Sequence, residues 1–77
     1  MNRDKLIHMA NQIALFFASY PHDEAVAGVT EHIVNFWEGR LRRQLSEHVA
    51  AGGTGLHPLV IEASARIAAP KAAKSAG

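Results

Sequence analysis

Residues that end helices recur along this chain at intervals too short for any long helix. Proline follows Tyr20, glycine stands at position 39, a glycine-rich segment covers residues 51–55, and proline stands again at position 70. The residue before a proline is pushed away from helical backbone angles, and glycine is common just after the last turn of a helix. The sequence between these points therefore has room only for short helices.

Between the breaks, apolar residues recur at three- and four-residue spacing, the pattern of one helix face. It predicts helices over about Asn2–Ser19, His22–Trp37 and Arg40–Ala50, and a fourth that begins at Pro58 and ends before Pro70. Asn2 is expected to cap the first helix, and no segment alternates like a strand. We predict an all-α fold, a small compact bundle of three to four short antiparallel helices over residues 1–69. Residues 70–77 are expected to be a flexible, disordered C-terminal tail.

Two apolar residues fall outside the stripes that would form the core. The stripes of the first two helices comprise Leu6, Met9, Ala10, Ile13, Phe16, Phe17 and Tyr20, then Val26, Val29, Ile33, Phe36 and Trp37. At about 100° per residue, Leu15 lies opposite the first stripe, and Ile61 lies away from the stripe of the fourth helix. We predict that a partner covers Leu15 and Ile61, although a single exposed apolar residue is ordinary on a monomer.

The size of the chain also favours a partner. A domain of 77 residues removes only about 60% of its unfolded surface from water, so it is marginally stable alone. Small domains are usually reinforced by disulfides, a metal or a partner. The chain contains no cysteine, which excludes disulfides, thiolate metal sites and a catalytic cysteine.

Charge and hydropathy disfavour binding to nucleic acid or membranes. Residues 1–69 hold six Lys and Arg against seven Asp and Glu, so they lack the general attraction for phosphate or anionic lipid that basic proteins show. The longest apolar run, Ile13 to Ala18, is too short for a signal peptide or a spanning helix. We expect a soluble, cytoplasmic protein.

The sequence carries no recognisable catalytic, cofactor or metal motif. The five histidines contain no pair at the i, i+4 spacing that directs two imidazoles at one metal, and H-E-x-x-H is absent. No serine lies in a nucleophile elbow. The segment Gly52-Gly53-Thr54-Gly55 lacks the lysine of a phosphate-binding loop. We therefore predict no catalytic residue and no bound cofactor or metal in this chain.

The segment HIVNFWEGRLRRQ, residues 32–44, combines two aromatic residues with three arginines. Trp and Arg are the residues most enriched at the energetic centres of protein interfaces. We predict partner contacts by Phe36, Trp37, Arg40 and Arg43 in addition to Leu15 and Ile61. An alternative is a small DNA-binding regulator, because Arg40, Arg42 and Arg43 follow a helix and a glycine turn as in a helix-turn-helix.

Four motifs in a fixed order resemble one known family. They are DKLIHMANQIALFF, PHDEAVAGVxxHIxxFW, RLRxQL and GGTGLHPLV, and the whole resemblance spans about Asp4 to Ile67. Together they resemble the small delta subunit of NAD-dependent, molybdenum-containing formate dehydrogenases. The family pattern usually reads Phe-Trp-Asp-Pro-Arg-Met where this chain has Phe36-Trp37-Glu38-Gly39-Arg40-Leu41, so a glycine replaces the proline at the expected helix break.

The resemblance implies a non-catalytic accessory subunit of a cytoplasmic complex that oxidises formate to carbon dioxide and reduces NAD. It implies docking on the catalytic alpha subunit, with a role in complex assembly or stability and in molybdenum cofactor loading. The partner subunits would carry bis-molybdopterin guanine dinucleotide, iron–sulfur clusters and FMN. A free-standing maturation chaperone that leaves before the enzyme works is a further alternative.

Overall fold

The computed structural model describes residues 2–68, which form four α-helices and no strand. The helices are α1 (Arg3–Phe17), α2 (His22–Phe36), α3 (Gly39–Ala50) and α4 (Pro58–Ala68). The predicted all-α fold is therefore confirmed, whereas the expected tail, residues 70–77, lies outside the described residues. None of the helices between residues 2 and 68 has the length and hydrophobicity needed to cross a membrane.

Helices α1, α2 and α4 begin at residues whose local chemistry favours a helix start. The side chain of Asn2 accepts a hydrogen bond of 2.8 Å from the backbone N–H of Lys5, as predicted for the cap of α1. Pro21 precedes α2, whose first turn carries Asp23 and Glu24 at the positive end of the helix dipole. Pro58 is the first residue of α4, where its missing N–H leaves no helical hydrogen bond unmade.

The break between α2 and α3, at Trp37 and Glu38, lies one residue earlier than the sequence suggested. Trp37 and Glu38 both have extended backbone angles, whereas Gly39 is already the first residue of α3. The prediction that Gly39 breaks the helix is therefore wrong. Gly39 has no positive φ, so its conformation does not require glycine. It occupies the first helical position, which favours the proline of the family pattern.

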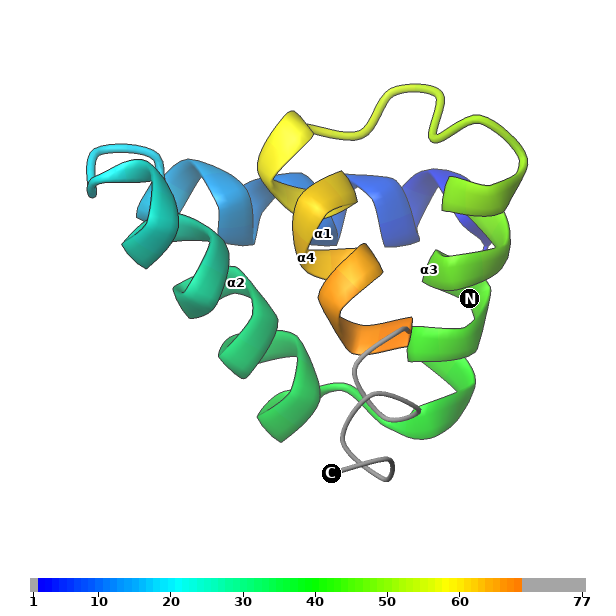
Figure 1. Ribbon diagram of the computed structural model, residues 1–77. Helices are drawn as coiled ribbons and strands as arrows, with labels where there is room; N and C mark the ends of the chain where they lie inside the picture. The colour runs from blue at the N-terminus through cyan, green and yellow to red at the C-terminus, as the bar shows by residue number, and fades with distance from the viewer. Residues whose placement is uncertain (1, 69–77) are drawn as a thin grey trace.

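The helices do not all run antiparallel to one another. Figure 1 shows α4 between α2 and α3, while α1 runs behind these three and across them. The core lies between the four helices, and small residues on α1, α2 and α4 allow close approach. The buried apolar residues are Leu6, Ala10, Ala14, Ala25, Val26, Val29, Ile33, Trp37, Leu45, Leu56, Leu59, Val60 and Ala63.

The loop between α3 and α4, residues 51–57, is fixed by polar contacts to α1 and α3. Asn11 donates from Nδ2 to the carbonyl of Gly55 and accepts from the backbone N–H of His57, both at 2.9 Å. His48 lies 2.8 Å from the carbonyl of Thr54 through Nε2. Gly53 has a φ of 66° and is buried, a backbone conformation that favours glycine.

Candidate partner-binding surface

A small core leaves several large apolar side chains on the surface. Those exposed among residues 2–68 are Leu15, Phe16, Tyr20, Val34, Phe36 and Ile61. Scattered apolar residues are normal on a monomer, whereas adjoining ones mark an interaction site.

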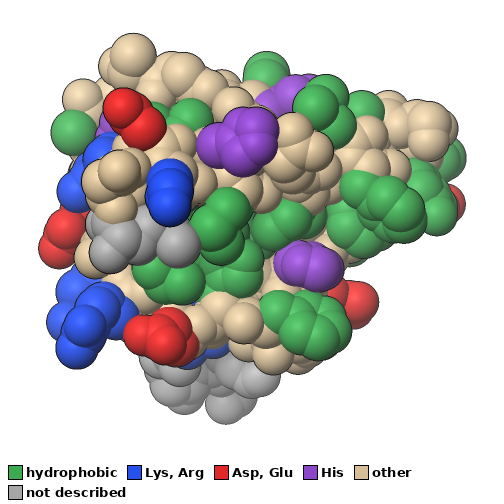
Figure 2. Space-filling model, turned by 180° about the vertical axis from the view of Figure 1, so that it is seen from behind, with side chains coloured by type: hydrophobic (Ala, Val, Ile, Leu, Met, Phe, Trp, Pro, Cys, Tyr) green, Lys and Arg blue, Asp and Glu red, His purple; other side chains and the backbone are tan. Residues whose placement is uncertain are grey.

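Helices α1 and α2 bring a set of aromatic and apolar side chains to one face. Ile13, Phe16 and Phe17 of α1 and His32 of α2 line a hollow of about 280 Å³. The ring of His32 lies 4.8 Å from the ring of Phe36, one helical turn further along α2. We call these five residues the aromatic face. Figure 2 shows the molecule from behind, with hydrophobic side chains gathered around histidines.

The backbone of α2 lets the two helices meet closely at this face. Any Cβ added to Gly28 would overlap the ring of Phe17, so α2 presents bare backbone to that ring. The rings of Phe16 and Phe17 meet edge to face, with centroids 4.9 Å apart, the arrangement that aromatic quadrupoles favour. His32 lies one turn beyond Gly28 on the same side of α2.

The most exposed aromatic side chains belong to this face rather than to the core. Phe16 is 68% exposed and Phe36 is 74% exposed, although both fall on the predicted apolar stripes of their helices. Each stripe is wider than the surface that the other helices of a 77-residue chain can cover. Periodicity therefore placed Phe16, and the neighbouring Ile13 and Phe17, on the core stripe, and it gave no signal for the position of His32.

The structure separates the two adjacent aromatic residues of the predicted site. Trp37 turns inward at the extended end of α2 and is only 6% exposed, as part of the core. Phe36 points outward and contacts His32. Of this pair, Phe36 is the side chain available at the surface, and Trp37 closes the core below it.

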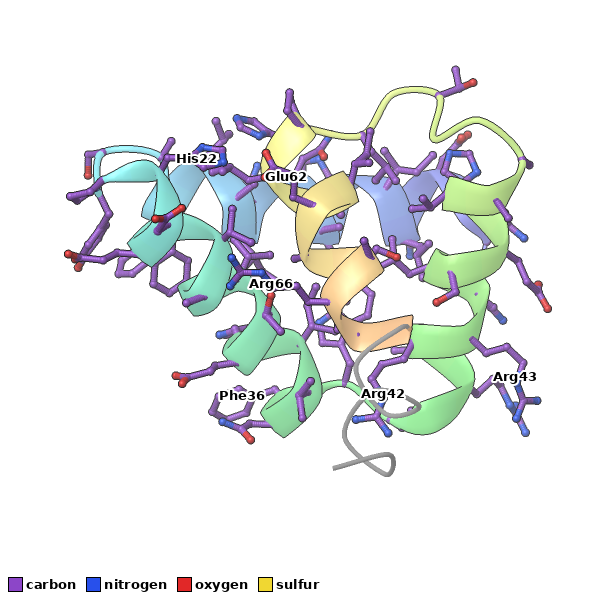
Figure 3. All side chains as sticks on the ribbon, viewed as in Figure 1. His22, Phe36, Arg42, Arg43, Glu62 and Arg66 are labelled. Carbon is purple, nitrogen blue, oxygen red and sulfur yellow. The ribbon has the colours of Figure 1, made fainter. Side chains whose placement is uncertain are left out.

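The arginines of α3 do not form one surface with Phe36. Arg42 donates from Nη1 to the carbonyl of Val34 at 3.0 Å, and so satisfies a backbone group at the end of α2. Arg40 and Arg43 are exposed. Figure 3 shows Phe36 and Arg43 pointing away from each other, with Arg42 between them. The three arginines therefore have different environments, which argues against a basic surface that binds nucleic acid.

Leu15 and Ile61, the other predicted contacts, do not line the hollow of the aromatic face. Leu15 is 59% exposed on the outer side of α1. Ile61 is 36% exposed, and its side chain packs over Gly53, where an added Cβ would lie 3.2 Å from Ile61 Cδ1. Whether a partner covers either residue stays a prediction.

A second hollow of about 400 Å³ lies between the α1–α2 turn and the start of α4. It is lined by Ala18, Tyr20, His22, Ala25, His57, Pro58 and Leu59. Nε2 of His22 lies 2.9 Å from Oε1 of Glu62, and Nδ1 of His57 accepts from the backbone N–H of Leu59. Over residues 2–68, no group of three or more His, Asp or Glu is placed to hold a metal ion. The polar groups here join α2 to α4 and cap α4.

Comparison with known proteins gives one family. The model of the family described as NADH-dependent formate dehydrogenase delta subunit FdsD matches residues 5–64 of the chain. The matched segment includes all of α2 and α3 and the whole aromatic face. No curated protein and no solved structure gives a significant match.

Proposed function

Because the chain belongs to the family of NADH-dependent formate dehydrogenase delta subunits, we propose that it is a non-catalytic accessory subunit that docks on the catalytic alpha subunit. In this proposal the aromatic face is the docking surface. The observation that carries it is the exposure of Phe16 and Phe36 around an apolar hollow. Aromatic side chains of this kind contribute most of the energy when they enter a pocket of a partner.

The lack of cysteine ligands in the sequence supports a non-catalytic role. Iron–sulfur clusters are held mainly by cysteine thiolates, and this sequence has no cysteine. We assign bis-molybdopterin guanine dinucleotide, iron–sulfur clusters and FMN to the partner subunits. The reaction, formate oxidation with reduction of NAD, takes place on those subunits in the cytoplasm.

Docking also has a physical benefit for the chain itself. Binding to the folded state stabilises that state by mass action. Covering Phe16 and Phe36 removes apolar surface from water, which is worth about 25 cal/mol per Å² before the losses of association are counted. We propose that the same contact stabilises the complex during assembly and supports loading of the molybdenum cofactor.

Co-expression of the tagged catalytic subunit with and without this chain tests the proposal. We expect the chain to co-purify with the catalytic subunit, and the molybdenum content per catalytic subunit to fall when the chain is omitted. A chain that stays monomeric beside the catalytic subunit, with unchanged molybdenum content, would contradict the proposal. One copy per catalytic subunit in the active enzyme would identify a permanent subunit rather than a transient chaperone.

A further inference from the structure

The charges that α1 and α2 place beside the aromatic face are acidic, while Arg42 of α3, near the Phe36 end, is engaged with the carbonyl of Val34. Residues 6–22, which include the α1 side of the face, contain no Lys, Arg, Asp or Glu. Helix α2 contains no Lys or Arg either, but carries Asp23, Glu24 and Glu31. The nearest basic residue along α1 is Lys5, about 12 Å along the helix axis from Ile13 at a rise of 1.5 Å per residue.

Two of these acids lie along the outer edge of the aromatic face. At about 100° per residue, Glu24 and Glu31 project beside the strip of α2 that carries Gly28 and His32. Both carboxylates are exposed. Figure 2 shows an acidic side chain close to a histidine and a hydrophobic side chain on this side of the molecule.

These acids have no ionic partner within the part of the chain that the structure describes. The salt bridge found over residues 2–68 joins His22 to Glu62, so Glu24 and Glu31 are not committed to a basic side chain there. Glu24 suits the first turn of α2 because of the helix dipole. Glu31 lies mid-helix, where the dipole gives it no such role.

We propose that the aromatic face binds an apolar segment of a partner subunit that is bordered by Lys or Arg. An apolar side chain of that segment enters the hollow lined by Phe16, Phe17 and His32. The flanking cations lie against Glu24 and Glu31. This inference rests on the proposed function and adds the chemistry of the partner, because complementary charge at the rim of an interface selects the partner and speeds association.

The test measures binding of the full chain to the catalytic subunit of the complex at low and high salt. We expect Glu24→Lys with Glu31→Lys to weaken binding about 10-fold at low salt, and the difference to shrink at high salt as the charges are screened. The isosteric pair Glu24→Gln with Glu31→Gln should weaken binding by about half as much on a logarithmic scale. Glu47→Lys, at an exposed position of α3, is the matched control and should bind like the wild type.

Circular dichroism melts establish whether each variant is folded. If the double Lys variant does not fold, the double Gln variant provides the binding comparison. Wild-type binding that neither set of variants nor salt alters would overturn the inference and leave the proposed function standing. No binding by the wild type would contradict the proposed function itself. A homodimer of the isolated chain that dissociates on Phe16→Ala would also overturn the inference, because the occupant would then be a second copy.

Discussion

Helix α1 has two flanks that differ in how completely the chain covers them. On one flank, Asn11 satisfies two backbone groups of loop 51–57, and His48 holds the same loop from α3. On the other flank, Phe16 is largely exposed beside an apolar hollow. Every buried side-chain polar atom over residues 2–68 has a hydrogen-bond partner, whereas the apolar surface is left incompletely covered.

The difference shows which part of the molecule is complete in isolation. Buried polar groups must be paired within the fold, since an unpaired one costs about 1–3 kcal/mol. Exposed apolar surface leaves no polar group unpaired and can be covered later by another protein. We therefore assign the loop flank to folding and the aromatic flank to docking.

Replacing Trp37 should have the largest effect, and on stability alone. Trp37→Ala removes a ring that is 94% buried in the core, and we expect a loss of about 3–5 kcal/mol in the free energy of unfolding. Urea denaturation followed by circular dichroism measures it. Trp37→Phe is the conservative control and should lose less. A loss below about 1 kcal/mol for Trp37→Ala would show that Trp37 is not part of the core.

Replacing the exposed phenylalanines should act on docking instead. Phe36→Ala and Phe16→Ala should each weaken binding to the catalytic subunit about 30-fold, as expected for an interface residue worth about 2 kcal/mol. Their free energies of unfolding should change by less than about 0.5 kcal/mol, because both rings are mostly in water. Isothermal titration calorimetry and urea denaturation give the two quantities. A variant that is destabilised but binds normally would reverse the division.

The loop flank should show the opposite behaviour. Asn11→Ala removes two hydrogen bonds and leaves the N–H of His57 without its side-chain acceptor, so we expect a loss of about 1–3 kcal/mol in unfolding free energy. Binding by the folded fraction should be unchanged. Gln12→Ala, at the exposed neighbouring position, is the control and should change stability by less than about 0.5 kcal/mol. Equal effects of the two variants would contradict the loop contacts.

The smallest effect is expected at the start of α3. Gly39→Pro should raise the free energy of unfolding by about 0.4–1 kcal/mol, because proline restricts the unfolded chain and suits the first helical position. Glu38 already has the extended angles, φ −71° and ψ 161°, that a residue before proline adopts. Denaturation by urea measures the change. A loss of stability would mean that α3 begins later than Gly39.

The sequence predicted the helices better than it predicted the exposed face. Periodicity and the residues Asn2, Pro21 and Pro58 placed three helix starts, because capping and proline geometry are local. The start of α3 was misplaced because glycine was interpreted as a break, although the extended angles fall on Trp37 and Glu38.

The composition of the aromatic face depends on how much of each stripe the other helices cover, which is not a local property. Phe16 and Ile33 carry the same periodic signal, yet one is exposed and the other fully buried. Likewise, adjacent positions in a helix differ by about 100°, and the turn at Trp37 then separates its ring from that of Phe36. Sequence alone predicted partner contacts for both residues of this pair but could not tell which ring faces solvent.

Site-specific photocrosslinking tests whether the chain docks through the aromatic face. A benzophenone amino acid is placed at position 16 or 36 of the full chain, and for comparison at position 15 or 47, and each chain is irradiated with the assembled complex. We predict crosslinks to the catalytic subunit from positions 16 and 36, with little from position 47. Crosslinks from position 15 or 47 but none from positions 16 and 36 would contradict docking through the aromatic face.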